Sequence, residues 1–198
     1  MNKPIVTIVA VCFNEEQYNM PFVDSMLNQT VTDGWQVYLL HNGPADSCRG
    51  YKQIQQRIQG DNRFLCRESE TNTGNWGCDN RKWAIDNCTT PYILQTSVQD
   101  YMLPDAMKYI LSMLEQKPDC ALFNAINHIV APCQMLDCQL AWSKIDWGMA
   151  AVKTSIAKQV GISQPAAYTA DWIFFNECIQ RKLFNKVLKN SGILTIHN

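Results

Sequence analysis

A polar segment of four residues, Ser97 to Asp100, is the first candidate in this sequence for chemical work. It follows the apolar run at 92–94, which is typical of a strand buried in a sheet, and Asp100 is the first acid after that run. The residues at 103–105 (Leu-Pro-Asp) then predict the start of a helix. Ligands of open α/β sheets bind just beyond the carboxyl ends of the strands, so this segment is a candidate binding site. Taken alone, the pattern also fits an acid that merely ends a strand.

The elements around this segment must bring other side chains to it. Apolar runs and helical spacings alternate along the first part of the chain, with strands expected at 6–12, 35–40, 63–66 and 92–94 and helices at 22–27, 48–58, 78–87 and 106–114. Such alternation predicts βαβ units and a mostly parallel sheet. Right-handed crossovers then place the ends of the first, second and fourth strands at one edge, which collects residues 13–15, 41–43 and 97–100.

The regular alternation of expected strands and helices ends after Pro118. Strands are expected at 120–129, 147–152, 186–188 and 192–196, and helices at 154–161 and 170–183, whereas 131–143 has no clean period. We expect one domain of 198 residues, in which 1–117 forms one half and 118–198 the other.

Composition excludes several classes of function. The net charge is -1 and there is no basic run, so a duplex nucleic acid is not an expected partner. The sequence shows neither a signal peptide nor the roughly 20 apolar residues of a membrane helix. Its nine cysteines are scattered without a CxxC, which argues against a zinc cluster and predicts unpaired thiols, a reducing compartment and a cytoplasmic protein.

The order of these motifs resembles the family 2 glycosyltransferases, which have the GT-A fold. The matching pieces run along nearly the whole chain: Cys12-Phe13-Asn14-Glu15, Asn28-Gln29-Thr30, the strand and turn at 37–46, Asn72-x-Gly74 running into Asn80, Gln99-Asp100 with Leu103-Pro104-Asp105, and Ala170-Asp171-Trp172. The resemblance implies an open, mostly parallel sheet flanked by helices. It also implies transfer of a sugar from a nucleotide-diphosphate sugar, with a UDP-sugar as the default donor, to a hydroxyl of a carbohydrate or another acceptor.

The resemblance also implies roles for particular residues. Asp171 matches the general base of an inverting enzyme, although an acid there could be a plain helix cap. Trp147 and Trp172, with Tyr168, could form an acceptor wall, although aromatic residues are more often core. The positions expected to bind the nucleotide-sugar are Cys12, Phe13, Glu15, Asn42, Gly43, Gly74, Asp79, Ser97, Gln99 and Asp100.

Departures from the family pattern bear on the metal. The family's Asp-x-Asp reads Ser97-Val98-Gln99 here, and a divalent cation (Mn²⁺ or Mg²⁺) prefers carboxylate and water oxygens. Either metal binding is weakened, or Asp100 carries it with help from His197. Asp79 stands where the family frequently has an arginine, so it either points away or helps to ligate a shifted cation together with Asp100.

Two other functions remain open on the sequence alone. A nucleotidyltransferase on a similar fold would normally show a basic, glycine-rich loop after the first strand, and the acidic 13–16 segment argues against it. A binding module that has lost its metal site would explain Ser97 and Gln99, whereas retention of Asp171-Trp172 argues for an enzyme.

Overall fold

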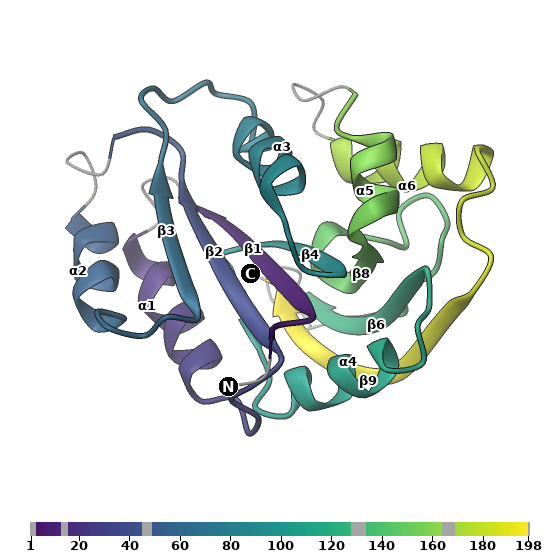
Figure 1. Ribbon diagram of the computed structural model, residues 1–198, viewed down its shortest axis with the longest axis horizontal. Coiled ribbons are helices and arrows are strands. Elements are labelled where there is room, and N and C mark those ends of the chain that lie inside the picture. The colour runs from purple at the N-terminus through teal and green to yellow at the C-terminus, as the bar shows by residue number, and fades with distance from the viewer. Residues whose placement is uncertain (1–2, 13–15, 45–48, 128–133, 164–168, 198) are drawn as a thin grey trace.

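The computed structural model describes residues 3–12, 16–44, 49–127, 134–163 and 169–197 (Figure 1). Its elements in chain order are β1 (Val6–Cys12), α1 (Glu16–Leu27), β2 (Trp35–His41), α2 (Arg49–Arg57), β3 (Phe64–Glu68), α3 (Cys78–Asn87), β4 (Tyr92–Ser97), β5 (Asp100–Met102), α4 (Ala106–Leu114), β6 (Cys120–Asn127), β7 (Gln134–Leu136), the 3₁₀ helix η2 (Trp147–Met149), β8 (Ala150–Lys153), α5 (Thr154–Val160), α6 (Ala170–Gln180) and β9 (Val187–His197).

The described strands form one mixed sheet in the order β3-β2-β1-β4-β8-β6-β9-β5, with β7 paired to β6. The first four strands are parallel, as expected. In their register Cys12 pairs with His41, and Val11 pairs with Ser97. The predicted meeting of the ends of β1, β2 and β4 at one edge is therefore confirmed.

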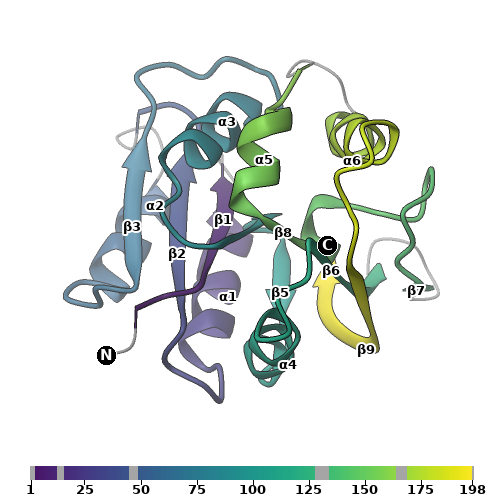
Figure 2. The ribbon, with the colours of Figure 1, turned by 45° about the vertical axis from the view of Figure 1, so that its right-hand side comes forward.

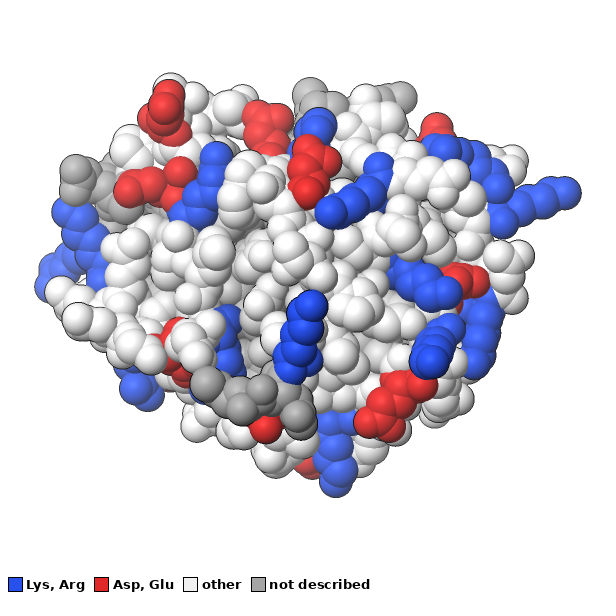
Figure 3. Space-filling model, in the orientation of Figure 1, with Lys and Arg blue, Asp and Glu red and all other residues white. Residues whose placement is uncertain are grey.

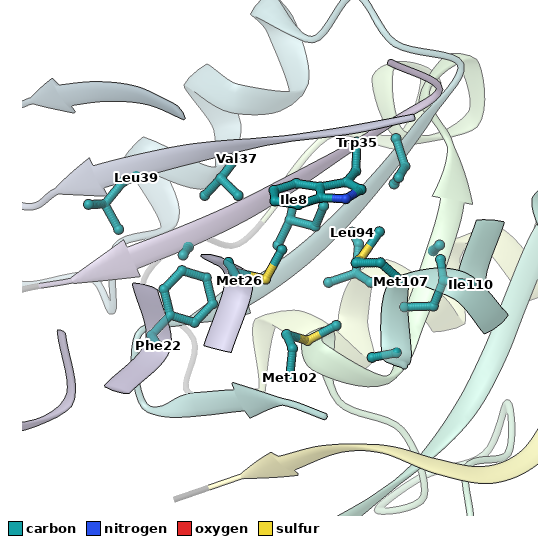
Figure 4. Close-up of a cluster of buried hydrophobic side chains, with 14 of the residues drawn as sticks. Ile8, Phe22, Met26, Trp35, Val37, Leu39, Leu94, Met102, Met107 and Ile110 are labelled. Carbon is teal, nitrogen blue, oxygen red and sulfur yellow. The ribbon is translucent and has the colours of Figure 1, made fainter. Parts of the chain in front are cut away.

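Both faces of β1 are buried, which explains its continuous apolar run. Successive side chains of a strand point to opposite faces. Ile8 accordingly joins a core made with α1, α2 and α4, part of which Figure 4 shows around Trp35 and Met26. Val9 joins the core on the other face, made with α3, α5 and α6. Figures 1 and 2 show these two groups of helices on either side of the sheet.

The second half of the chain differs from its prediction at 147–152 and in its late strands. The segment 147–152 was expected to be a strand, but it begins with η2, because the side chain of Asp146 accepts a hydrogen bond from Gly148 N at 2.9 Å and caps that turn. The two late strands expected at 186–188 and 192–196 are one strand, β9, whose pairing with β6 shifts register beside Asn124.

Strand β5 was not predicted. It is three residues long, and it pairs with β9 in antiparallel fashion, so that Asp100 lies opposite His197. A strand this short has no periodicity of its own, and its partner lies almost a hundred residues further along the chain. The polar segment 97–100 therefore joins two strands, since Ser97 ends β4 and Asp100 begins β5.

The surface and the thiols agree with the composition. On the face shown in Figure 3 the positive and negative side chains are interspersed. The cysteines within the described ranges are free, including Cys138. Among these same ranges, no helix has the length and apolar character needed to cross a bilayer.

Candidate functional site

The ends of three strands are tied to one another by backbone hydrogen bonds. Asn42 N, just after β2, donates to Cys12 O at 2.8 Å. Val98 N, just after β4, donates to Val11 O at 3.2 Å. These bonds hold the predicted positions Cys12, Asn42 and Ser97–Asp100 along one edge, whereas Phe13 and Glu15 lie outside the described residues.

The loop before α3 folds back onto this edge. Asn42 Nδ2 donates to Asn72 Oδ1 at 2.8 Å, and the same oxygen accepts from Gly74 N at 2.8 Å. Gly43 N donates to Ser69 Oγ at 2.8 Å. Gly77, with φ of 72°, leads into α3, and a Cβ there would lie 2.2 Å from Val11 Cγ1. The loop can thus approach β1 only because this position is glycine.

Asp100 is buried, and both of its carboxylate oxygens are engaged. It is 4% exposed. His197 Nδ1 lies 2.5 Å from Oδ1, while Oδ2 accepts from the Thr96 hydroxyl and from Ser97 N at 3.2 Å. The bond to Asp100 raises the pKa of His197 to about 9, so the histidine is protonated at neutral pH. The expectation that Asp100 and His197 lie together is met, but they lie together as an ion pair.

The residues around Asp100 do not fit a site for Mn²⁺ or Mg²⁺. Such cations need several oxygen ligands, preferably charged. Ser97 and Gln99 carry no charge, and Ser97 Oγ accepts from Gln99 N at 3.1 Å. Asp79 is exposed on the first turn of α3, whereas Asp100 is buried in its own hydrogen bonds. Across the described ranges no group of three or more His, Cys, Asp or Glu side chains could hold a metal ion. The assignment of Asp100 and His197 to a metal stays a prediction.

Asp171 lies on the first turn of α6, where partial burial disfavours the charged form of its carboxyl group. Its Oδ1 accepts from Trp172 N at 2.7 Å. Burial, with a smaller contribution from Asp146, raises the pKa of Asp171 to about 6, against the opposing effects of the Trp172 N–H and Arg81. A carboxyl group with this pKa is deprotonated at neutral pH yet basic enough to accept a proton.

Sequence reasoning missed two charged residues near Asp100 and Asp171, namely Arg81 and Asp146. These four residues and His197, which pairs with Asp100, are called the charged cluster. Arg81 is 7% exposed, and its Nη1 donates to Gln95 Oε1 at 3.4 Å. Burial lowers the pKa of Arg81, whereas Cys78 and the carboxylates of Asp146, Asp100 and Asp171 raise it. Burial and the nearby Asp100 raise the pKa of Asp146. The Asp-x-Gly spacing at 146–148 is a cap signal in the sequence, but no local pattern marks Arg81 as buried.

The two tryptophans expected at the acceptor side have different surroundings. The Trp147 ring packs against Phe174 at 5.1 Å and Phe175 at 5.9 Å between ring centroids, with the Arg81 guanidinium over it at 5.8 Å. Its half-buried ring therefore packs against the core beside α6. Trp172 instead meets Trp142 edge to face, at 5.8 Å and 81°. Tyr168 lies outside the described residues.

No family model matches this sequence, and no curated protein matches it either. Several solved structures, however, resemble this chain in their fold. TarS from S. aureus in complex with UDP-GlcNAc superposes with a TM-score of 0.79 at 15% identity, covering 96% of this chain and 57% of that one. The mannosyltransferase PcManGT from Pyrobaculum calidifontis, in complex with GDP-Man and Mn²⁺, superposes with a TM-score of 0.73 at 14% identity, covering 99% of this chain and 57% of that one. This chain has the GT-A fold.

The predicted fold class is therefore confirmed. The chain spans between 36% and 60% of the length of the first TarS structures that it matches. At these identities the likeness shows a shared fold, and membership of family 2 stays a prediction.

Proposed function

We propose that this GT-A chain is a glycosyltransferase that moves a sugar from a nucleotide-diphosphate sugar to an acceptor hydroxyl, with inversion at the anomeric carbon. Residues 1–117 would bind the donor and 118–198 the acceptor, within one domain. Donor binding across the ends of β1, β2 and β4 is supported by the position of ligand sites in open α/β sheets. TarS has been solved with UDP and with UDP-GlcNAc, and PcManGT with GDP-Man, which favours a nucleotide-sugar donor with a UDP-sugar as the default.

The observation that carries this proposal is the carboxyl group of Asp171. It lies at the start of α6, on the side of the molecule to which the arrowheads of β1, β2 and β3 point in Figure 2. As general base, Asp171 would take the proton of the acceptor hydroxyl while the oxygen attacks the anomeric carbon. The nucleoside diphosphate would leave from the opposite face, which inverts the configuration.

Positive charge for the leaving diphosphate is needed in the transition state. Arg81 and protonated His197 are cationic side chains of the described cluster. Because the side chains around Asp100 do not fit a divalent cation, these two side chains would supply the positive charge.

A transfer assay with a matched control tests the proposal. Wild-type protein is incubated with UDP-GlcNAc, UDP-glucose or GDP-mannose, and release of nucleoside diphosphate is followed with and without simple saccharide acceptors. Asp171→Asn should lower kcat by about 10²–10⁴, because that is the usual contribution of a general base. Asp105→Asn is the control, since Asp105 also stands at a helix start, before α4, and its carboxylate accepts from Thr30 Oγ1 at 2.7 Å.

The second candidate is a binding module, favoured by the neutral Ser97 and Gln99. It predicts that nucleotides bind but that no donor is turned over. Release of nucleoside diphosphate by wild type and by Asp105→Asn, lost in Asp171→Asn, would contradict the module. Equal rates in wild type and Asp171→Asn would remove Asp171 from the mechanism.

A further inference from the structure

An exposed tryptophan that sequence reasoning did not select contacts Trp172, the residue after the proposed base. Trp142 is 58% exposed, one of the largest exposed apolar side chains of the described chain. Its ring is held edge to face against Trp172, which directly follows Asp171. Edge-to-face pairs fix the orientation of a ring beyond what burial alone provides.

The turn that carries Trp142 is held by backbone hydrogen bonds. Gln139 N donates to Lys144 O at 2.9 Å, and Lys144 N donates back to Ala141 O at 3.1 Å. Ser143, next to the tryptophan, has a φ of 57°, a left-handed conformation that closes the turn. The ring is therefore presented to solvent in a fixed place, which reduces the entropy lost when a ligand stacks on it.

Polar side chains surround this turn. Asp137 accepts from Gln139 Nε2 at 2.9 Å and pairs with Lys189 Nζ of β9 at 2.5 Å, which ties the turn to the sheet. The bond from Lys189 lowers the pKa of Asp137, and nearby Lys144 adds to the effect. An aromatic face with a rim of carboxylate, amide and ammonium groups matches a sugar ring, which offers apolar C–H faces and hydroxyls around its edge.

We propose that Trp142, oriented by Trp172, is a stacking platform for a saccharide acceptor, with Asp137 and Gln139 at its polar rim. The inference rests on the proposed transferase function, because the acceptor hydroxyl must come to Asp171, one residue before Trp172. In this proposal Trp142 takes the place that the sequence analysis gave to Trp147, whose half-buried ring packs against Phe174.

Indole N–H signals in a two-dimensional NMR spectrum test the platform directly. The chain has six tryptophans, and Trp142→Phe identifies the Trp142 signal by its loss. The probes are cellotriose and chitotriose, titrated with and without excess UDP. We expect the Trp142 and Trp172 signals to shift, Trp142→Ala to bind about tenfold more weakly, and Trp142→Phe to stay within about threefold of wild type.

Tyr109→Ala is the matched control, because Tyr109 is an exposed aromatic residue (46%) on α4 and has no role in the proposal. Trp142→Phe keeps an aromatic ring beside Trp172 and should keep the wild-type melting temperature, whereas Trp142→Ala loses that contact and should melt slightly lower while staying folded. Saccharide shifts that are absent at Trp142, or binding that Trp142→Ala leaves unchanged, overturn the platform.

Nucleotide binding by UDP, measured in the same samples, separates this proposal from the proposed function. UDP binding without saccharide shifts at Trp142 overturns the platform and leaves the transferase standing. Saccharide binding at Trp142 without binding of UDP or GDP supports the platform and contradicts the transferase.

Discussion

At the scale of single residues, the charge of Asp171 works against the stability of the fold. Burial raises its pKa from an ordinary value of 3.8 to about 6. A raised pKa means that the folded state binds the proton more tightly, so the stabilisation is complete below about pH 3.8 and is lost as the pH rises through about 6. Asp171→Asn keeps the hydrogen-bond acceptor for Trp172 N and removes the charge.

We therefore expect Asp171→Asn to melt at the same temperature as wild type or higher at pH 7.5, and to lose this advantage at pH 4. Thermal unfolding at both pH values measures the difference. In wild type the rate of transfer should rise with pH around the value of about 6 at which Asp171 loses its proton. A variant less stable at pH 7.5 than at pH 4, relative to wild type, would show that Asp171 has a structural role.

The ion pair of His197 and Asp100, by contrast, stabilises the fold. Because the hydrogen bond to Asp100 raises the pKa of His197 from 6.5 to about 9, its stabilisation is complete below pH 6.5 and is lost as the pH rises through about 9. His197→Gln should thus lower the melting temperature more at pH 6 than at pH 10. The same substitution made on top of Asp100→Asn should show no such pH dependence, and an equal loss at both pH values would argue against the ion pair.

At the scale of elements, the short helix η2 connects parts of the site that lie far apart in sequence. Gly148 packs so closely on Asp100 that a Cβ would lie 2.9 Å from Oδ2. The neighbouring Trp147 packs on Phe174 and Phe175 of α6, the helix that carries Asp171. One turn therefore contacts both the Asp100 end and the Asp171 end of the cluster.

Two substitutions at Asp146 separate the cap of this turn from its charge. Asp146→Ala removes the hydrogen bond to Gly148 N and should destabilise the protein by about 0.5–2 kcal/mol. Asp146→Asn can keep that bond, because asparagine caps about as well as aspartate. With a negative neighbour removed, the pKa of Asp171 should fall, and the rising limb of the pH–rate profile should move to lower pH. A profile that does not move in Asp146→Asn would show that the two carboxylates do not interact.

The sequence predicted some elements well for a physical reason. Strand β1 and helix α3 begin and end where the sequence predicts, because β1 lies inside the parallel sheet and α3 packs on one of its faces. The apolar run at 147–152 wrongly predicted a strand over its whole length. The side chain of Asp146, just before the run, caps the first residues as the short helix η2. Strand β5 is fixed only by a distant partner, and the burial of Arg81 depends on how α3 meets β4 and η2. Such tertiary contacts leave no periodic trace in the sequence.

At the scale of the whole molecule, the joined ends of β1, β2 and β4 predict where a nucleotide binds. UDP or GDP should shift backbone amide signals of Asn42, Gly74 and Ser97 and raise the melting temperature. Signals confined to the opposite ends of these strands would place the ligand elsewhere and contradict the donor site.

The same titration tests the role of a divalent cation. Since Ser97 and Gln99 are neutral and the oxygens of Asp100 are engaged, we expect the affinity for UDP to change by less than about tenfold between EDTA and Mn²⁺. Mn²⁺ should also bind weakly to the protein alone, as followed by electron paramagnetic resonance. Tight Mn²⁺ binding that Asp100→Asn abolishes would instead confirm Asp100 as a ligand.

The pairing of β5 with β9 also determines when the site can exist during synthesis. Asp100 and His197 are 97 residues apart in sequence, and β9, which carries His197, pairs with β5 on one side and in parallel with β6 on the other. Contacts between distant parts of a chain form late, and a growing chain delivers its residues from the N-terminus onward. While the ribosome is still adding β8 and α5, the four parallel strands can already assemble, but the carboxylate of Asp100 has no histidine to pair with. The charged pair of this fold therefore forms only once β9 has joined the sheet, after the four parallel strands.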